Sequence, residues 1–202
     1  NETAEGYLEV LERQSNRLKK LIEDLIEASK ASTGNLAVHL EKLEAGVSVV
    51  QIVGEFEDKL NAADLTLLIQ KPETPVYVMA DGRHFWRVID NLMNNICKYA
   101  QPGTRVYVDL RENGGQVELI FRNTSRYPLN ISSEELMERF VRGDESRNTE
   151  GSGLGISIAK SLMELMGGSF MLYVDGDLFK VVLGFAQMEE EKEPLDEDKS
   201  GK

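Results

Sequence analysis

The chain has 202 residues, of which 41% are hydrophobic, and this is enough for one sizeable core with an appended element. Its 35 acidic and 23 basic residues give a formal net charge of -12, so a surface that neutralises nucleic-acid phosphates is not expected. The single cysteine, Cys97, excludes an internal disulfide and a cysteine-based metal site, which suits a reducing compartment.

The chain begins with a polar stretch at Asn1 rather than with Met, so we expect a piece of a longer protein without a signal peptide. No apolar run reaches the roughly 18 to 20 residues of a membrane span. Residues 7–30 predict one long helix with a narrow seam of apolar and small side chains at spacings of three and four. This period favours packing against other helices over a surface position on a globular core. The seam consists of Leu8, Leu11, Ser15, Leu18, Ile22, Leu25 and Ser29. Gly34 is expected to follow the end of this helix.

The rest of the chain predicts mixed strands and helices with prominent hairpins. In chain order we expect a strand near 37–43, a helix near 47–62, strands at 65–70 and 75–80, and a helix at 82–100 capped by Asp81. A hairpin of 105–113 with 116–123 and a short helix at 133–142 follow. The last expected elements are a helix from the glycine-rich stretch to 166 and a hairpin within 169–187. This order predicts an α+β fold, in which helices cover one face of a mixed or antiparallel sheet.

Three asparagines stand on the predicted helix at 82–100, although asparagine is a poor helix former. Asn91 and Asn95 are four residues apart and share a face, and Lys98 lies within a turn of both. Solvent exposure is the ordinary explanation of a single asparagine in a helix. Two amides near a lysine and a tyrosine, however, suit a magnesium ion bridged to phosphate oxygens, because magnesium takes oxygen ligands and keeps several waters.

A glycine-rich stretch precedes the last predicted helix and reads Gly151-Ser152-Gly153-Leu154-Gly155. A helix N-terminus attracts phosphate through its free N–H groups and its dipole, and glycine lets the backbone approach closely. The stretch is not a P-loop, since no Gly-Lys-Ser/Thr follows, and no strand runs directly into it as in a dinucleotide-binding fingerprint. We expect it to hold a phosphate chain.

Together these segments resemble the bacterial sensor histidine kinases, whose ATP-binding domain has the Bergerat fold shared with gyrase and the heat-shock chaperones. The family's asparagine motif, approximately N-L-L-x-N-A-x-K-Y, reads NLMNNICKY at 91–99, and its second glycine motif, G-x-G-L-G-L-x-I, reads GSGLGISI at 151–158. Between them, ERFVRGD at 138–144 resembles the family's phenylalanine motif. Residues 7–30 look like the second helix of its dimerisation and phosphotransfer hairpin. The resemblance covers almost the whole chain up to the acidic tail and implies a two-layer sandwich of a mixed, mostly antiparallel sheet with helices on one face, preceded by a long bundle-type helix.

The resemblance also implies roles for the matching residues of the asparagine motif. Asn95 would supply an oxygen to Mg²⁺, with Asn91 close by on the phosphate side. Lys98 would meet phosphate oxygens as a point charge. Tyr99 would pack beside the adenine or the ribose.

The later motifs would complete the nucleotide site. Phe140 would anchor a mobile lid, from which Arg142 could reach the γ-phosphate. The backbone N–H groups from Gly153 to Gly155 would hold the phosphates. With the residues discussed next, the implied ATP-binding set is Asn91, Asn95, Lys98, Tyr99, Asn123, Ser125, Phe140, Arg142, Gly151, Ser152, Gly153, Leu154 and Gly155.

One motif departs from the family pattern. The first glycine motif usually reads D-x-G-x-G after a strand, and its Asp accepts a hydrogen bond from the adenine amino group. Here residues 122–129 read RNTSRYPL, with Asn123 in place of Asp and Ser125 in place of glycine. An asparagine carbonyl can still accept one hydrogen bond, but without charge assistance. We therefore expect adenine recognition to survive with weaker affinity, and the base of the lid to be stiffer.

The implied reaction transfers the γ-phosphoryl group of ATP to a histidine nitrogen, with magnesium and backbone dipoles offsetting the charge. In the family the acceptor stands on the first hairpin helix and is usually followed by an acidic residue. His39 precedes Leu40 and His84 precedes Phe85, so neither matches. We expect the acceptor to lie outside this chain, which would bind nucleotide without autophosphorylating in the usual way.

Two other functions stay open from the sequence. A degenerate kinase-like module, which binds nucleotide weakly or not at all and serves as a protein-interaction platform, would fit Asn123 and Ser125. Asn95, Lys98 and the second glycine motif oppose it. A serine kinase of the anti-sigma type shares the fold, but such proteins generally lack a helix like the one at 7–30.

The expected organisation has three parts. Residues 1–34 form the second helix of an incomplete dimerisation and phosphotransfer hairpin, 35–187 the catalytic ATP-binding domain, and 188–202 an acidic, disordered tail. The implied cofactors are ATP and Mg²⁺. The implied partners are the missing hairpin helix, a response regulator and a second copy of the full-length protein, with no nucleic acid. The chain would be the cytoplasmic portion of a cell-membrane sensor.

Overall fold

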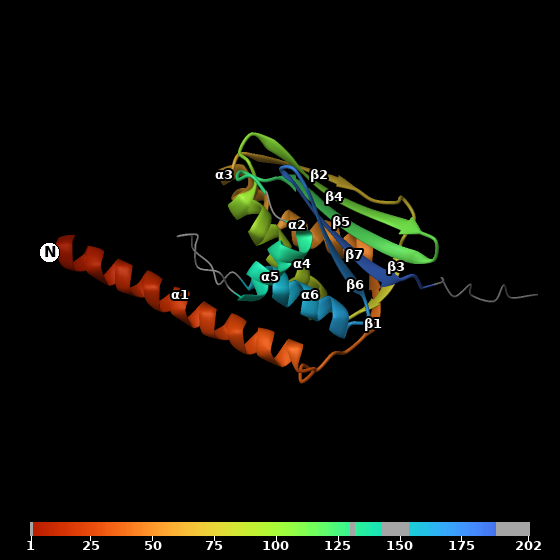
Figure 1. Cartoon of the computed structure of the whole chain (residues 1–202), viewed down its shortest axis with the longest axis horizontal. Coiled ribbons are helices and arrows are strands. Elements are labelled where there is room, and N and C mark those ends of the chain that lie inside the picture. The colour runs from red at the N-terminus through yellow and green to blue at the C-terminus, as the bar shows by residue number, and fades with distance from the viewer. Residues whose placement is uncertain (1, 130–131, 143–153, 189–202) are drawn as a thin grey trace, which may run out of the picture.

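A computed structural model describes residues 2–129, 132–142 and 154–188, with their side chains except those of 2–5, 17 and 138–142. It confirms an α+β fold with helices on one face of a mixed sheet (Figure 1). The helices are α1 (Glu2–Ser32), α2 (Ala45–Gly54), α3 (Glu57–Ala62), α4 (Gly82–Tyr99), α5 (Ser133–Arg142) and α6 (Gly155–Leu165). The strands are β1 (Glu41–Glu44), β2 (Leu65–Gln70), β3 (Tyr77–Ala80), β4 (Thr104–Asn113), β5 (Gln116–Thr124), β6 (Ser169–Asp175) and β7 (Leu178–Ala186).

The main sheet has five strands in the order β2-β4-β5-β7-β6. Only the β2–β4 pair is parallel, so the described sheet is mixed and mostly antiparallel, as predicted. In the β4–β5 turn both Gly114 and Gly115 have positive φ, 58° and 83°, the conformation that a two-residue hairpin turn of type I′ requires. Strands β1 and β3 pair only with each other among the named strands and form a separate small sheet.

The predicted helix at 47–62 is wrong, because this segment forms two helices. The N–H groups of Glu55 and Phe56 bond to carbonyls three residues back, which tightens and ends α2. The last residue of α2 is Gly54, which has a low helix propensity, and Phe56 in the break is buried in the core. The strand predicted at 37–43 begins later, at Glu41, where pairing with β3 starts.

Helix α4 runs through the centre of the helical layer. Asp81 caps it by accepting hydrogen bonds from the backbone N–H groups of Arg83 and His84, as the sequence predicted. Its apolar stripe packs in the core that the inner face of the sheet and α6 complete, and Val88, Ile89, Leu92, Met93 and Ile96 are all buried. This packing leaves the asparagine-bearing side of α4 facing away from the sheet.

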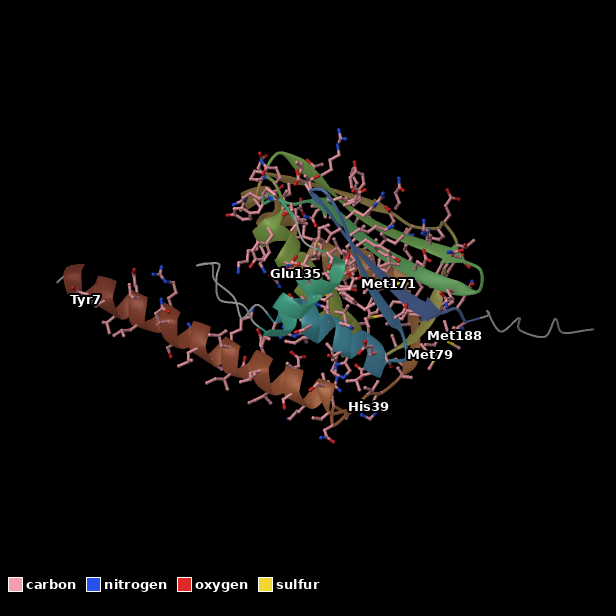
Figure 2. All side chains as sticks on the ribbon, viewed as in Figure 1. Tyr7, His39, Met79, Glu135, Met171 and Met188 are labelled. Atoms are coloured by element: carbon pink, nitrogen blue, oxygen red, sulfur yellow. The ribbon has the colours of Figure 1, made fainter. Side chains whose placement is uncertain are left out.

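Helix α1 lies along the side of the molecule that carries α5 and α6, and its N-terminal half extends beyond the core (Figure 1). Figure 2 shows Tyr7 on that projecting half and His39 near the C-terminal end of the helix. The helix ends at Ser32, and Gly34 follows with φ of 69°, close to the predicted boundary. The large apolar side chains of the predicted seam, Leu8, Leu11, Leu18, Ile22 and Leu25, are exposed.

None of the described helices combines the length and hydrophobicity needed to cross a bilayer. The predicted acidic tail lies outside the described residues from 189 onward.

Candidate functional site

The three asparagines of α4 have different surroundings. Asn94 is fully engaged, since its Nδ2 donates to the carbonyl and carboxylate oxygens of Asp90, at 2.8 Å each, and its Oδ1 accepts from Lys59 Nζ at 3.0 Å. Asn91 and Asn95 are half-buried, and within the described part of the chain neither side chain has a hydrogen-bond partner. The Nδ2 of Asn91 is a completely buried donor. Asn94 is therefore structural, whereas Asn91 and Asn95 are available to a ligand.

The first turn of α6 lies against Asn91. A Cβ placed on Gly155 would stand 3.2 Å from Asn91 Oδ1, closer than an ordinary van der Waals contact. Leu154, at the N-cap, makes no side-chain capping hydrogen bond, and its carbonyl accepts from Ile158 N. The structure thus brings the asparagine face of α4 and the N-terminus of α6 together, and a glycine at 155 allows this close approach.

The far end of α4 is tied to the end of β5. Two backbone hydrogen bonds of 2.8 Å and a β-bridge join residues 99–101 to residues 124–126, namely Gln101 N to Thr124 O, Arg126 N to Tyr99 O, and the Ala100–Ser125 bridge. Lys98 Nζ lies 4.9 Å from the centre of the Tyr99 ring. Lys98 and Tyr99 therefore adjoin the segment that carries Asn123 and Ser125.

Asn123 is oriented as a hydrogen-bond acceptor. Its side chain is buried, with 4% exposure, and its Nδ2 donates to the Thr124 carbonyl at 3.2 Å. The remaining polar atom, Oδ1, is buried with no hydrogen-bond partner in the described structure. Because Nδ2 is engaged, the amide offers an acceptor to a ligand, as an aspartate would, but without a charge.

Ser125 has a structural role in the adjoining turn. Its N–H donates to the Asp177 carbonyl at 2.7 Å, and its Oγ accepts from Tyr127 N at 3.3 Å. It is buried, with 8% exposure. These contacts connect the end of β5 to the β6–β7 turn.

The chemistry available at these residues is polar binding. Burial raises the pKa of the Cys97 thiol more than nearby Lys59 lowers it, which disfavours the thiolate form of this side chain. No group of three His, Cys, Asp or Glu that could hold a metal occurs among the described residues. A cation held here would need amide oxygens together with oxygens of its ligand.

Several predicted residues lie beyond what the structure describes. Gly151, Ser152 and Gly153 fall outside the described residues, and Phe140 and Arg142 are described only as backbone in α5. The N–H of His39 donates to Asp81 Oδ2 at 2.9 Å, and His84 Nε2 lies 3.0 Å from the Ala37 carbonyl oxygen. Both histidines therefore hold the linker that follows α1. That neither of them is the phosphoryl acceptor stays a prediction.

Sequence reasoning missed the residues that orient these amides. Asp90 stands four residues before Asn94, so the helical i, i+4 spacing could have predicted their contact. Lys59 comes from α3, and the Thr124 contact is made by a backbone carbonyl, so no sequence pattern pointed to either.

A family model described as histidine kinase-, DNA gyrase B- and HSP90-like ATPase matches residues 80–194. Sensor protein IrlS of Burkholderia pseudomallei is 27% identical over 173 residues, and sensor protein kinase WalK of Staphylococcus aureus is 26% identical over 172 residues. Each alignment covers 83% of this chain, which spans 36% of the length of IrlS and 41% of that of WalK.

Solved structures show the same fold. Histidine kinase AdeS of Acinetobacter baumannii matches with a TM-score of 0.71 at 21% identity, covering 90% of this chain and 84% of that one. Full-length ShkA in complex with AMPPNP matches with a TM-score of 0.76 at 16% identity, covering 92% and 39%. Histidine kinase ThkA in complex with the response regulator protein TrrA matches with a TM-score of 0.67 at 15% identity, covering 93% and 52%.

Proposed function

Since the chain belongs to the histidine kinase-, DNA gyrase B- and HSP90-like ATPases, as the catalytic domain of a sensor histidine kinase, we propose that it binds Mg²⁺-ATP where α4, α6 and the end of β5 meet and transfers the γ-phosphoryl group to a histidine outside this chain. One observation carries the proposal. A buried donor, Asn91 Nδ2, and a buried acceptor, Asn123 Oδ1, both lack a partner among the described residues. Leaving such an atom unsatisfied costs about 1–3 kcal/mol, a cost that a bound ligand can remove.

The adenine would bind at the β5 end of this site. Asn123 Oδ1 would accept a hydrogen bond from the exocyclic amino group, which is a donor in adenine. Guanine presents a carbonyl acceptor at the corresponding position, which would face the acceptor Asn123 Oδ1 unless the amide turned over and gave up its contact with Thr124. The geometry therefore favours adenine over guanine. Tyr99 would pack beside the base or the ribose.

The phosphates would bind at the α6 end. Asn91 Nδ2 and the first N–H groups of α6 would donate to phosphate oxygens, and the helix dipole adds to the attraction. Lys98 would contribute its charge. Gly151, Ser152 and Gly153, with Phe140 and Arg142, complete the proposed set as lid and phosphate-loop residues.

The chemistry of the residues fits a magnesium ion shared with phosphate. Asn95 lies one turn after Asn91 and has a free amide within the described structure. Magnesium accepts oxygen ligands and retains several waters, so one amide oxygen suffices as a protein ligand when phosphates provide others. When bound, the ion would neutralise charge that develops during phosphoryl transfer.

The phosphoryl acceptor and the partners that we propose rest on membership of the family. We propose residues 1–34 as part of the dimerisation and phosphotransfer hairpin, 35–187 as the catalytic domain and 188–202 as a tail. The acceptor histidine would stand on the other hairpin helix, and a second copy of the protein would complete the bundle. The ThkA complex with TrrA supports a response regulator as the further partner. We place the chain in the cytoplasmic part of a membrane sensor.

Calorimetric titration with ATP and ADP, with and without Mg²⁺, tests the binding step. The proposal predicts saturable binding of adenine nucleotides that is stronger with magnesium and much weaker for GTP. Absence of binding at millimolar nucleotide would contradict it and favour the protein-interaction platform.

The transfer step has its own test. The chain is incubated with labelled ATP and a separate fragment that carries an acceptor-helix histidine. An acid-labile, base-stable phosphoryl group on that fragment is the expected product. An acid-stable product would indicate a serine kinase instead.

A further inference from the structure

One arginine joins helix α1 to the catalytic core. Arg87, on α4, contacts three carboxylates: Nη2 lies 2.8 Å from Asp24 Oδ1 and 2.8 Å from Glu27 Oε2, and Nη1 lies 3.3 Å from Asp90 Oδ2. Its Nε also donates to Glu27 Oε2 at 2.9 Å. Asp24 and Glu27 are neighbours on one face of α1, so the fork of a single guanidinium spans two helices.

This cluster is largely shielded from water. The Arg87 side chain is 21% exposed and that of Asp24 only 7%. Burial opposes the charged form of Arg87, but hydrogen bonds and attraction from Glu27 and Asp24 outweigh it, so the pKa of Arg87 lies above its usual value. Removing the guanidinium would leave three carboxylates close together with their shared cation gone, and like charges in a shielded site repel.

Apolar burial adds little to the attachment. Of the described side chains of α1, Ala31 is the one buried hydrophobic residue, and Leu21 and Ala28 are half-buried. An alanine contributes little to burial energy compared with a leucine or phenylalanine. Arg87 therefore makes the ion pairs that join α1 to α4, beside the packing of α1 on α6.

The docked face differs from the apolar seam. Leu21, Asp24, Ala28 and Ala31 recur at helical spacing toward the core, whereas Ile22 and Leu25 are exposed. The Arg87 contact therefore leaves the seam open for another helix while the core is docked.

The linker that follows α1 can act as a pivot. Asp81 and His84 hold residues 37–39 to the start of α4. Between this anchor and α1 lies Gly34, whose φ of 69° is a conformation that glycine adopts without strain. If the Arg87 contact opens, the linker stays attached while the helix swings.

We propose that Arg87 is an electrostatic latch that holds α1 on the α4–α6 face of the catalytic core, and that the chain exchanges between this docked arrangement and a released one in which α1 pivots at Gly34. The partner that this surface fits is a helix with two carboxylates one turn apart, and α1 supplies it through Asp24 and Glu27. The latch sets how freely the core moves relative to α1 and forms without nucleotide.

Pulsed electron-spin resonance on the full chain tests the latch. Spin labels are attached at Glu12→Cys on α1 and Glu57→Cys on α3, two exposed sites, in a Cys97→Ser background. We expect one narrow distance distribution for the parent. Arg87→Met should raise the released population at least about tenfold, which corresponds to about 1.4 kcal/mol.

Arg83→Met is the matched control, since Arg83 stands one turn earlier on α4 with a side chain that is 77% exposed. It should leave the distribution narrow, and Arg87→Glu combined with Asp24→Arg should narrow it again. A distribution unchanged by Arg87→Met, or broadened equally by Arg83→Met, would overturn the latch. Circular dichroism of each variant confirms that the core is folded, and the absence of nucleotide keeps this outcome separate from that of the proposed function.

Discussion

Replacing Asn123 by leucine should weaken nucleotide binding without destabilising the fold. The exchange removes the buried, unpartnered Oδ1 and the Nδ2 that bonds to Thr124 O. Leucine has a similar shape and no polar atom. The Thr124 carbonyl stays satisfied, because Gln101 N also donates to it at 2.8 Å.

The exchange should affect the free energy of unfolding and the free energy of nucleotide binding in opposite directions. Removing the unsatisfied acceptor regains about 1–3 kcal/mol of desolvation cost, whereas losing the Nδ2 hydrogen bond costs about 0.5–1.5 kcal/mol. The stability of the nucleotide-free protein should therefore lie between about 0.5 kcal/mol below and about 2.5 kcal/mol above that of the parent. Binding loses an acceptor for a buried amino group, worth about 1–3 kcal/mol, so Kd should rise about 5- to 150-fold.

Urea unfolding of the nucleotide-free proteins and calorimetric titration with ATP measure the two effects. The companion variant Asn123→Asp keeps an acceptor but places a buried carboxylate oxygen beside the Thr124 carbonyl, so it should lose stability and bind ATP better than the leucine variant. If Asn123→Leu lowers stability by several kcal/mol and leaves the affinity for ATP unchanged, the assignment of Asn123 as an adenine acceptor is wrong.

Three further outcomes are expected. Gly155→Ala should raise Kd for ATP about tenfold, because the added Cβ would displace Asn91. The melting temperature should stay nearly unchanged, because alanine has a higher helix propensity than glycine. An unchanged Kd would count against the α4–α6 contact as part of the site. Asn95→Ala should abolish the magnesium-dependent part of nucleotide affinity and spare the affinity measured in EDTA, and a persistent magnesium effect in the titration would refute the metal assignment. Burial raises the pKa of Asp81, but hydrogen bonds from the backbone N–H groups of His39 and other residues lower it by more, so the pKa of Asp81 lies below its usual value. Asp81 therefore contributes stability above its unfolded pKa of about 3.9 and loses it as the pH falls through the lower folded pKa, so urea unfolding of Asp81→Asn should depend less on pH below about pH 4.

Local signals in the sequence predicted much of the fold. The Gly114–Gly115 turn and the Asp81 cap each depend on residues a few positions apart, and both appear as expected. The break between α2 and α3 was missed, although Gly54, the last residue of α2, has a low helix propensity. The pairing of β1 with β3 was missed because propensity indicates a strand but not its partner.

The site was predictable in its residues but not in its polar details. The resemblance pointed to Asn91 and Gly155, and the structure brings them together. It could not indicate that the Thr124 carbonyl orients Asn123, because a backbone acceptor leaves no trace in the sequence. The docking of Asp24 and Glu27 on Arg87 was also invisible, since charged residues outside a helical seam are usually solvated.

A ¹⁵N NMR titration of the chain with Mg²⁺-ATP tests the central claim most directly. The claim is that α4, α6 and the end of β5 enclose one nucleotide, so the side-chain NH₂ signals of Asn91 and Asn123 and the backbone signal of Gly155 should shift together along one saturation curve. Signals of the β4–β5 turn at Gly114 should stay in place. Saturable shifts confined to other parts of the protein, or no shift at millimolar ATP, would contradict the account.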